Sequence, residues 1–122
     1  MVSRRLAVAA ALCALLAGCP GGTADCEALP ERYELALTAE TLTPSDPAVC
    51  RGDEVTLLVR SDVDGIIHIH AYDEQIPATP VAAGETVELA FAADRSGQFS
   101  IELHPEESPQ GVVVGIFTVH EP

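Results

Sequence analysis

The chain has 122 residues, a length that allows one domain with a core of its own. It contains 19 acidic residues against six arginines and no lysine, which gives a formal net charge of −13. Because no basic surface is present to neutralise phosphate groups, nucleic acid is excluded as a partner.

The first 18 residues predict an export signal. Arg4 and Arg5 precede an apolar run, residues 6–16, which is too short to span a bilayer as a helix. The run leads into the string LLAGC at residues 15–19, which resembles the signal of bacterial lipoproteins. That resemblance implies that Cys19 carries a lipid and anchors the protein in a membrane, at the cell surface or in the periplasm. An ordinary secretory signal would imply the same compartment without the anchor.

Two cysteines remain outside this segment. Cys13 lies within the signal and Cys19 is the lipid site, which leaves Cys26 and Cys50. In an oxidising compartment such a pair most simply forms a disulfide, which would join the N-terminal segment to the loop before a strand that starts near Glu54. Metal ligation by the two thiolates is the alternative, although their long spacing matches no compact thiolate motif.

The charge of the mature chain is more negative still. Two of the six arginines lie in the signal, so four arginines face 19 acidic residues and the net charge is −15. An acidic surface adsorbs poorly to anionic lipid, so contact with the membrane requires the covalent anchor. The same surface attracts cations.

A period of two runs through most of the remaining chain. Residues 19–31 are rich in Gly, Pro and Ala and predict a flexible tether, and residues 32–122 predict one domain. Apolar alternation predicts strands at 33–37, 55–60, 66–72, 87–91, 99–104 and 112–120. Loops or turns rich in Pro, Gly and Asp are expected at 43–52, 61–65, 75–84, 94–97 and 105–111. About seven short strands without a helical period predict an all-β sandwich.

The strand at 66–72 carries a pair of histidines. His68 and His70 are two residues apart and therefore point to one face, while Ile67, Ile69 and Ala71 point to the other. Such a pair is either half of a metal site or a polar seam in a small β-domain.

Four short segments occur in an order that resembles a known type of β-domain. RGDEV at 51–55 opens a strand, SDV at 61–63 precedes the histidine strand, AGE at 83–85 precedes a VELAF strand, and SGQF at 96–99 begins the next. In this order they resemble a cupredoxin-like domain over residues 37–119, which implies a Greek-key β-sandwich. In copper-binding cupredoxins, one copper ligand is a histidine of the strand that corresponds to the histidine strand here. The other ligands, a cysteine, a histidine and often a methionine, lie in the segment between the last two strands.

The blue-copper ligand set is not retained. Leu103 falls at the place of the cysteine, with His104 next to it, and residues 105–111 contain no histidine. The only methionine is Met1. Because the strongly coupled blue-copper centre requires a thiolate, we expect no blue-copper electron transfer.

The histidines allow a different metal site. His68, His70 and His104 would converge if the last strands bring His104 to the same end of the sandwich, and three imidazoles suit Cu(II) and also Zn(II). Carboxylates that would add an oxygen or orient a ring are Asp73, Glu102 and Glu106. In the metal-free alternative one ring packs inward on a backbone partner and the other is solvated.

These features predict a binding or accessory module outside the cytoplasm rather than an enzyme, with copper as the expected ion. A metal-free structural or protein-interaction domain is the alternative, with the acidic surface and the loops at 43–52 and 75–84 as contact regions. A more remote alternative is a cupin-like metalloenzyme. His68, His70 and Glu74 resemble the first metal motif of that family, but no second motif follows.

Overall fold

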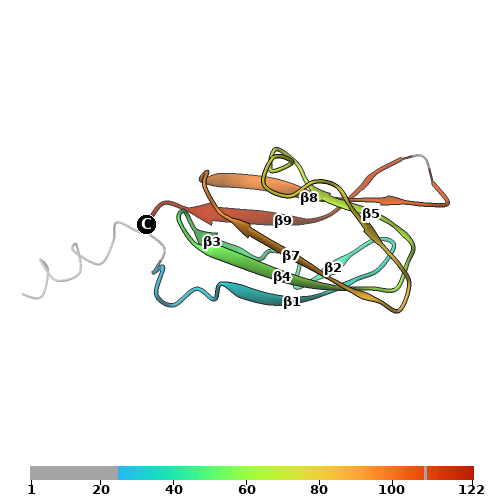
Figure 1. Cartoon of the computed structure of the whole chain (residues 1–122), viewed down its shortest axis with the longest axis horizontal. Coiled ribbons are helices and arrows are strands. Elements are labelled where there is room, and N and C mark those ends of the chain that lie inside the picture. Colours follow the sequence, from blue (N-terminus) through green and yellow to red (C-terminus); the bar gives the residue numbers. More distant parts are fainter. Residues whose placement is uncertain (1–24, 109) are drawn as a thin grey trace, which may run out of the picture.

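The computed structural model of the chain describes residues 25–108 and 110–122, which form nine β-strands in two packed sheets (Figure 1). The strands are β1 (Arg32–Leu37), β2 (Leu42–Thr43), β3 (Ala48–Cys50), β4 (Glu54–Ser61), β5 (Gly65–Ile69), β6 (Thr79–Val81), β7 (Thr86–Ala92), β8 (Gly97–Pro105) and β9 (Val112–His120). No helix in these residues is long and apolar enough to cross a membrane. The predicted signal segment and the predicted lipid site at Cys19 lie outside the described residues.

The two sheets interleave segments that are distant in the sequence. One sheet has the order β2-β1-β4-β7, and the other has the order β3-β9-β8-β5-β6. Most neighbours are antiparallel, but β1 runs parallel to β4 and β3 runs parallel to β9. The predicted all-β sandwich is therefore confirmed.

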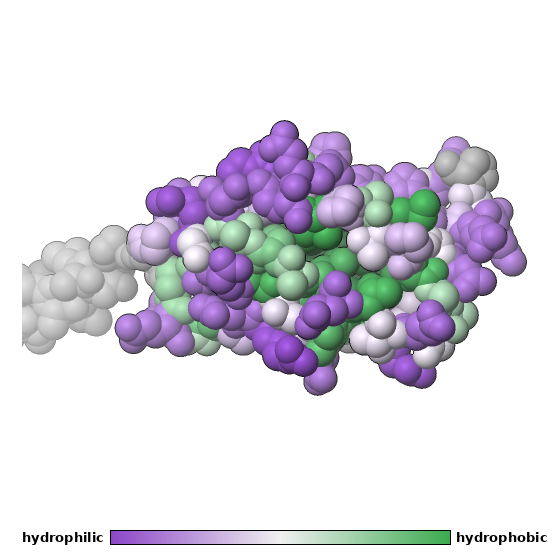
Figure 2. Space-filling view, in the orientation of Figure 1, coloured by the Kyte–Doolittle hydropathy of each residue, from purple (hydrophilic) through white to green (hydrophobic). Residues whose placement is uncertain are grey.

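The core lies between the sheets, where the apolar positions of the alternating strands meet. In β4, Val55, Leu57 and Val59 are at most 1% exposed, as the period of two predicts. Figure 2 shows polar side chains over much of the visible face, with apolar side chains between the two layers. The hydrophobic effect of this buried layer is what holds the two sheets together.

Tyr72 occupies the middle of the aromatic part of the core. Its ring makes edge-on contacts with Phe91, Phe99 and Phe117, with centroid distances of 4.7–5.7 Å. The hydroxyl donates to the Arg95 carbonyl oxygen at 2.6 Å and accepts from the Arg95 amide at 3.0 Å. Burial raises the pKa of Tyr72 above its ordinary value, so the phenol remains a neutral donor.

Three short strands lie where loops were expected. β2 and β3 overlap the segment at 43–52, and β6 lies inside the segment at 75–84. All three are edge strands of two or three residues, too short for alternation to reveal. The proline in β6, Pro80, is tolerated because an edge strand leaves one side of its backbone unpaired.

The histidine strand is shorter than predicted. β5 ends at Ile69 rather than residue 72, because Ala71 adopts a positive φ of 67° that turns the chain. Ala71 is therefore exposed, and the expectation that it shares the buried face of Ile67 and Ile69 is wrong. The turn directs Tyr72 into the core.

The predicted disulfide between Cys26 and Cys50 is confirmed. Cys50 is the last residue of β3 and is 1% exposed, and it lies 24 positions after Cys26. The bridge fixes the segment before β1 to the sheet that contains β3.

Candidate metal centre

His68, the histidine of β5, lies on the outer face of the five-stranded sheet. β5 pairs with β8 so that His68 stands opposite Glu102, and Ile66 stands opposite His104. The residues between them, Ile67 and Leu103 among others, are buried in the core. Because strand side chains alternate, His68, Glu102 and His104 all point away from the core.

These three side chains form a compact cluster. The Nε2 atoms of His68 and His104 are 3.2 Å apart, and the two rings stack with their centroids separated by 5.2 Å. Oε2 of Glu102 lies 3.8 Å from Nε2 of His68. One ligand atom from each residue lies within 4.8 Å of the other two, and all three side chains are half-buried. We call His68, Glu102 and His104 the outer-face cluster.

Two further side chains border the outer-face cluster. His70 points to the same side as His68, as predicted, but its side chain is 70% exposed and its Nδ1 lies 3.6 Å from Oε2 of Glu102. It is therefore a neighbour of the cluster rather than part of it. Asp73 lies on the other side, with Oδ1 at 3.4 Å from Nδ1 of His68.

A glycine makes room for the His104 ring. A Cβ atom on Gly111 would lie 2.6 Å from Cε1 of His104 and 3.1 Å from its Nε2, closer than atoms pack. Gly111 directly precedes β9, so the start of this strand lies against the ring. The position of His104 in the outer-face cluster thus depends on the missing side chain at residue 111.

A β-bulge lies beside the cluster. Ile101 pairs with Gly115 and Glu102 pairs with Val113, which leaves Val114 as the additional residue of β9. The bulge allows Val114 and Gly115 both to be buried, while Val113 is 55% exposed next to Glu102. Bulges of this kind change the direction of neighbouring side chains, and they are frequent beside functional sites.

A buried leucine, Leu103, occupies the position that corresponds to the blue-copper cysteine. Leu103 is fully buried and points into the core. Both cysteines of the described residues are joined in the disulfide, and Cys50 pairs with His120 at the end of β9 remote from Gly111. The expected meeting of the histidines at one end of the sandwich is replaced by a meeting on the outer face, because the residues that flank a buried Leu103 must point outward.

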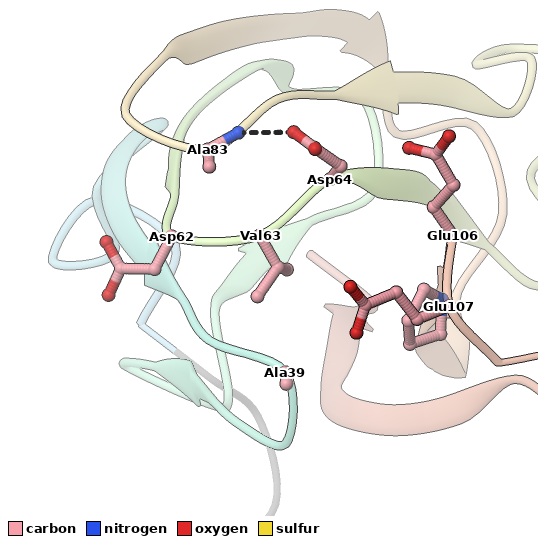
Figure 3. A pocket seen from close by; sticks show the side chains of 8 residues that line it. Ala39, Asp62, Val63, Asp64, Ala83, Glu106 and Glu107 are labelled. Carbon is pink, nitrogen blue, oxygen red and sulfur yellow. Dashed lines mark hydrogen bonds between the residues drawn. The ribbon is translucent and has the colours of Figure 1, made fainter.

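A second group of carboxylates lines a pocket of about 520 Å³ near the start of β5 (Figure 3). Glu106, one of the carboxylates expected near a metal, belongs to this pocket, and Asp64 there accepts a hydrogen bond from the Ala83 amide at 2.9 Å. Among the described residues these carboxylates do not form a ligand group. The pocket is lined by Ala39, Asp62, Val63, Asp64, Ala83, Pro105, Glu106 and Glu107.

Sequence reasoning identified both imidazoles of the cluster but gave Glu102 only a supporting part. The signal that finds it is the alternation within β8, because Glu102 is two residues from His104 and must share its face. Its position opposite His68 depends on strand register, which no local pattern specifies.

No protein-family model matches this chain, and no curated protein matches it. Among solved structures it is similar to reduced auracyanin from the photosynthetic bacterium Roseiflexus castenholzii, with 16% identity and a TM-score of 0.57 over 75% of this chain and 98% of that chain. A chain in a heme-copper terminal oxidase dimer has 17% identity and a TM-score of 0.57, covering 93% of this chain and 97% of that one. A multicopper oxidase from Pseudomonas thermotolerans has 22% identity and a TM-score of 0.55 over 74% of this chain and 29% of its own. The fold is therefore cupredoxin-like, as the sequence predicted.

Proposed function

We propose that the protein is a metal-binding accessory module outside the cytoplasm that holds Cu(II) on the outer-face cluster and is not an enzyme. A lipid on Cys19 anchors it to a membrane, at the cell surface or in the periplasm. The ion would be bound by His68, Glu102 and His104, and the module would buffer it or pass it on. The cupredoxin-like fold and the disulfide support an extracytoplasmic setting.

The separation of the two Nε2 atoms carries this proposal. Imidazole nitrogens lie about 2.0 Å from a bound copper or zinc ion, so two nitrogens 3.2 Å apart subtend an angle of about 105° at the ion. That angle lies between the ideals of square-planar and tetrahedral coordination. The two rings are therefore already spaced as ligands of one ion, with the Glu102 carboxylate beside them.

The donor set favours Cu(II). Two imidazoles and a carboxylate suit Cu(II) and Zn(II), and the affinity of such sites for first-row divalent ions is highest for copper. No sulfur donor lies in the cluster, which disfavours Cu(I). The net charge of −15 after the signal raises the local concentration of cations. His70 on the rim offers a further nitrogen.

A metal-free interaction domain is the second candidate, and one observation favours it. The Nε2 contact between His68 and His104 is a complete hydrogen bond if one ring carries a proton there and the other does not. The pair then needs no ion, and it would stabilise the pairing of β5 with β8 as a cross-strand contact. The acidic surface and the loops at 43–52 and 75–84 would bind a protein.

Titration of the oxidised domain with Cu(II), followed by calorimetry and electron paramagnetic resonance, separates the two candidates. We expect one ion per chain with nitrogen hyperfine structure, and no intense visible band of a copper–thiolate centre. The double variant His68→Ala/His104→Ala should lose this binding, because it removes two of the three ligands. His120→Ala is the matched control, since it removes a histidine at the far end of β9.

Three outcomes would contradict either the proposed copper site or the expectation that the protein has no blue-copper centre. Wild-type uptake no greater than that of the double variant would leave only the interaction domain. Equal loss in His120→Ala would mean that copper binds histidines non-specifically. An intense visible absorption band would overturn the exclusion of a thiolate centre.

The lipid anchor has its own test. Metabolic labelling with a fatty acid should mark the wild-type protein, and the Cys19→Ser variant should be unlabelled and released from membranes. Cys13→Ser is the matched control, because this cysteine lies within the signal that would be cleaved. Unlabelled wild-type protein would mean that the segment is an ordinary secretory signal.

A further inference from the structure

The turn that ends β5 places the Asp73 carboxylate beside His68, a ligand of the proposed metal site. Ala71 is the only non-glycine residue with a positive φ in the described part of the chain, a conformation that is strained for a residue with a Cβ. The turn is closed by a hydrogen bond from the Tyr72 amide to the Ile69 carbonyl at 3.0 Å. It leaves Oδ1 of Asp73 at 3.4 Å from Nδ1 of His68. Residues with strained backbone conformations cluster at functional sites.

The two nitrogens of His68 therefore face different partners. Nδ1 faces the Asp73 carboxylate at 3.4 Å, and Nε2 faces Nε2 of His104 at 3.2 Å, with the Glu102 carboxylate farther away at 3.8 Å. An ionised carboxylate only accepts hydrogen bonds, and Asp73 is the nearer of the two, so the proton of a neutral His68 ring belongs on Nδ1. Nε2 of His68 is then unprotonated and carries a lone pair. The contact with His104 requires one proton, so Nε2 of His104 must carry it.

We propose that Asp73 is a positioning residue that fixes the tautomers of both histidines, so that Nε2 of His68 keeps a lone pair that accepts from His104 in the metal-free protein and binds the ion in its place. This inference rests on the proposed metal-binding function. His68 is the first ligand, because it needs no proton movement. For His104 to bind through Nε2, that nitrogen releases its proton to solvent and Nδ1 takes one up, so the ring remains neutral and no net proton is exchanged. A carboxylate on the remote nitrogen of a ligating histidine also raises its basicity.

The distance of 3.4 Å is longer than a strong hydrogen bond. The Asp73 side chain is 58% exposed rather than packed in the core. Its exposure also means that water competes for the carboxylate. The expected effect is therefore a tautomer preference and a ligand orientation, and a large change in folding stability is not expected.

The test reads the tautomers in metal-free protein. Two-bond ¹H–¹⁵N spectra of histidine-labelled protein at about pH 8, where unperturbed imidazoles are neutral, should show His68 protonated on Nδ1 and His104 on Nε2. Asp73→Ala should abolish this preference. Asp73→Asn should preserve it, because the amide oxygen still accepts from Nδ1. Glu74→Ala, which removes the same charge one residue later, should leave both tautomers unchanged.

The same variants are then titrated with Cu(II). Asp73→Ala should bind about 10- to 100-fold more weakly than wild type, and Asp73→Asn less weakly. Glu74→Ala should match wild type to within about threefold, because an exposed charge is largely screened. A His68 ring protonated on Nε2 in wild type, or tautomers that Asp73→Ala leaves in place, overturns the inference even if copper binds. The expected tautomers without copper binding would support the Asp73 contact and overturn the proposed function alone.

Discussion

Replacing Gly111 by alanine should lower the affinity for Cu(II) about 100-fold while the domain keeps its stability. The three atoms nearest to the new Cβ all belong to the His104 ring. Because the ring is the end of a rotatable side chain, it can swing away without moving the backbone. Nε2 of His104 then leaves the outer-face cluster and one of the three ligands is lost. Removing a residue that only orients a ligand costs 10- to 100-fold in metal affinity, so we expect the loss of a ligand itself to reach the upper end of this range, about 2.7 kcal/mol.

The free energy of unfolding should change by less than about 1 kcal/mol. The backbone at residue 111 does not adopt a left-handed conformation, so alanine is not strained there. Replacing glycine also restricts the unfolded chain, which contributes about 0.4–1 kcal/mol in favour of folding. Gln110→Ala is the matched control, because that side chain is exposed next to the same position. Wild-type copper affinity in Gly111→Ala would show that the position of His104 is not required for binding.

The long strands were predictable because one of their faces is buried and the other is exposed to solvent. β4, β7 and the inner half of β8 follow the period of two that the sequence displays. β2, β3 and β6 escaped prediction because they have two or three residues each and derive their strand character from their partners. The parallel pairing of β3 with β9 joins segments about 70 residues apart, and nothing local in the sequence indicates it.

The candidate site was predictable in its residues and in its face of the sheet, but not in the contacts that assemble it. Alternation places His68 with His70, and the buried Leu103 forces its neighbours outward, so the outer face was available from the sequence alone. The contact between His68 and His104 depends on the register of β5 against β8, in which they stand diagonally opposite. The left-handed Ala71 that brings Asp73 to His68 has no sequence signal, because alanine does not favour that conformation.

Removing the disulfide with the double variant Cys26→Ala/Cys50→Ala should destabilise the domain by about 3.5 kcal/mol. The cysteines are 24 positions apart, and in the chain-entropy model closing a loop of this length restricts the unfolded chain by that amount. For a domain of this size the loss corresponds to a decrease in Tm of roughly 15–25 °C. Chemical unfolding at neutral pH, with circular dichroism as the signal, measures the difference directly.

Reduced wild-type protein is the control that separates the cross-link from the packing of Cys50, which is 1% exposed. If the cross-link accounts for the effect, reduced wild type and the double variant should unfold at the same denaturant concentration. Copper binding by the folded double variant should equal that of wild type, because the outer-face cluster contains no sulfur and lies at the other end of β9. Loss of copper binding while the variant is still folded would instead assign the thiolates to the ion. A site on the outer face would then not be the one that binds copper.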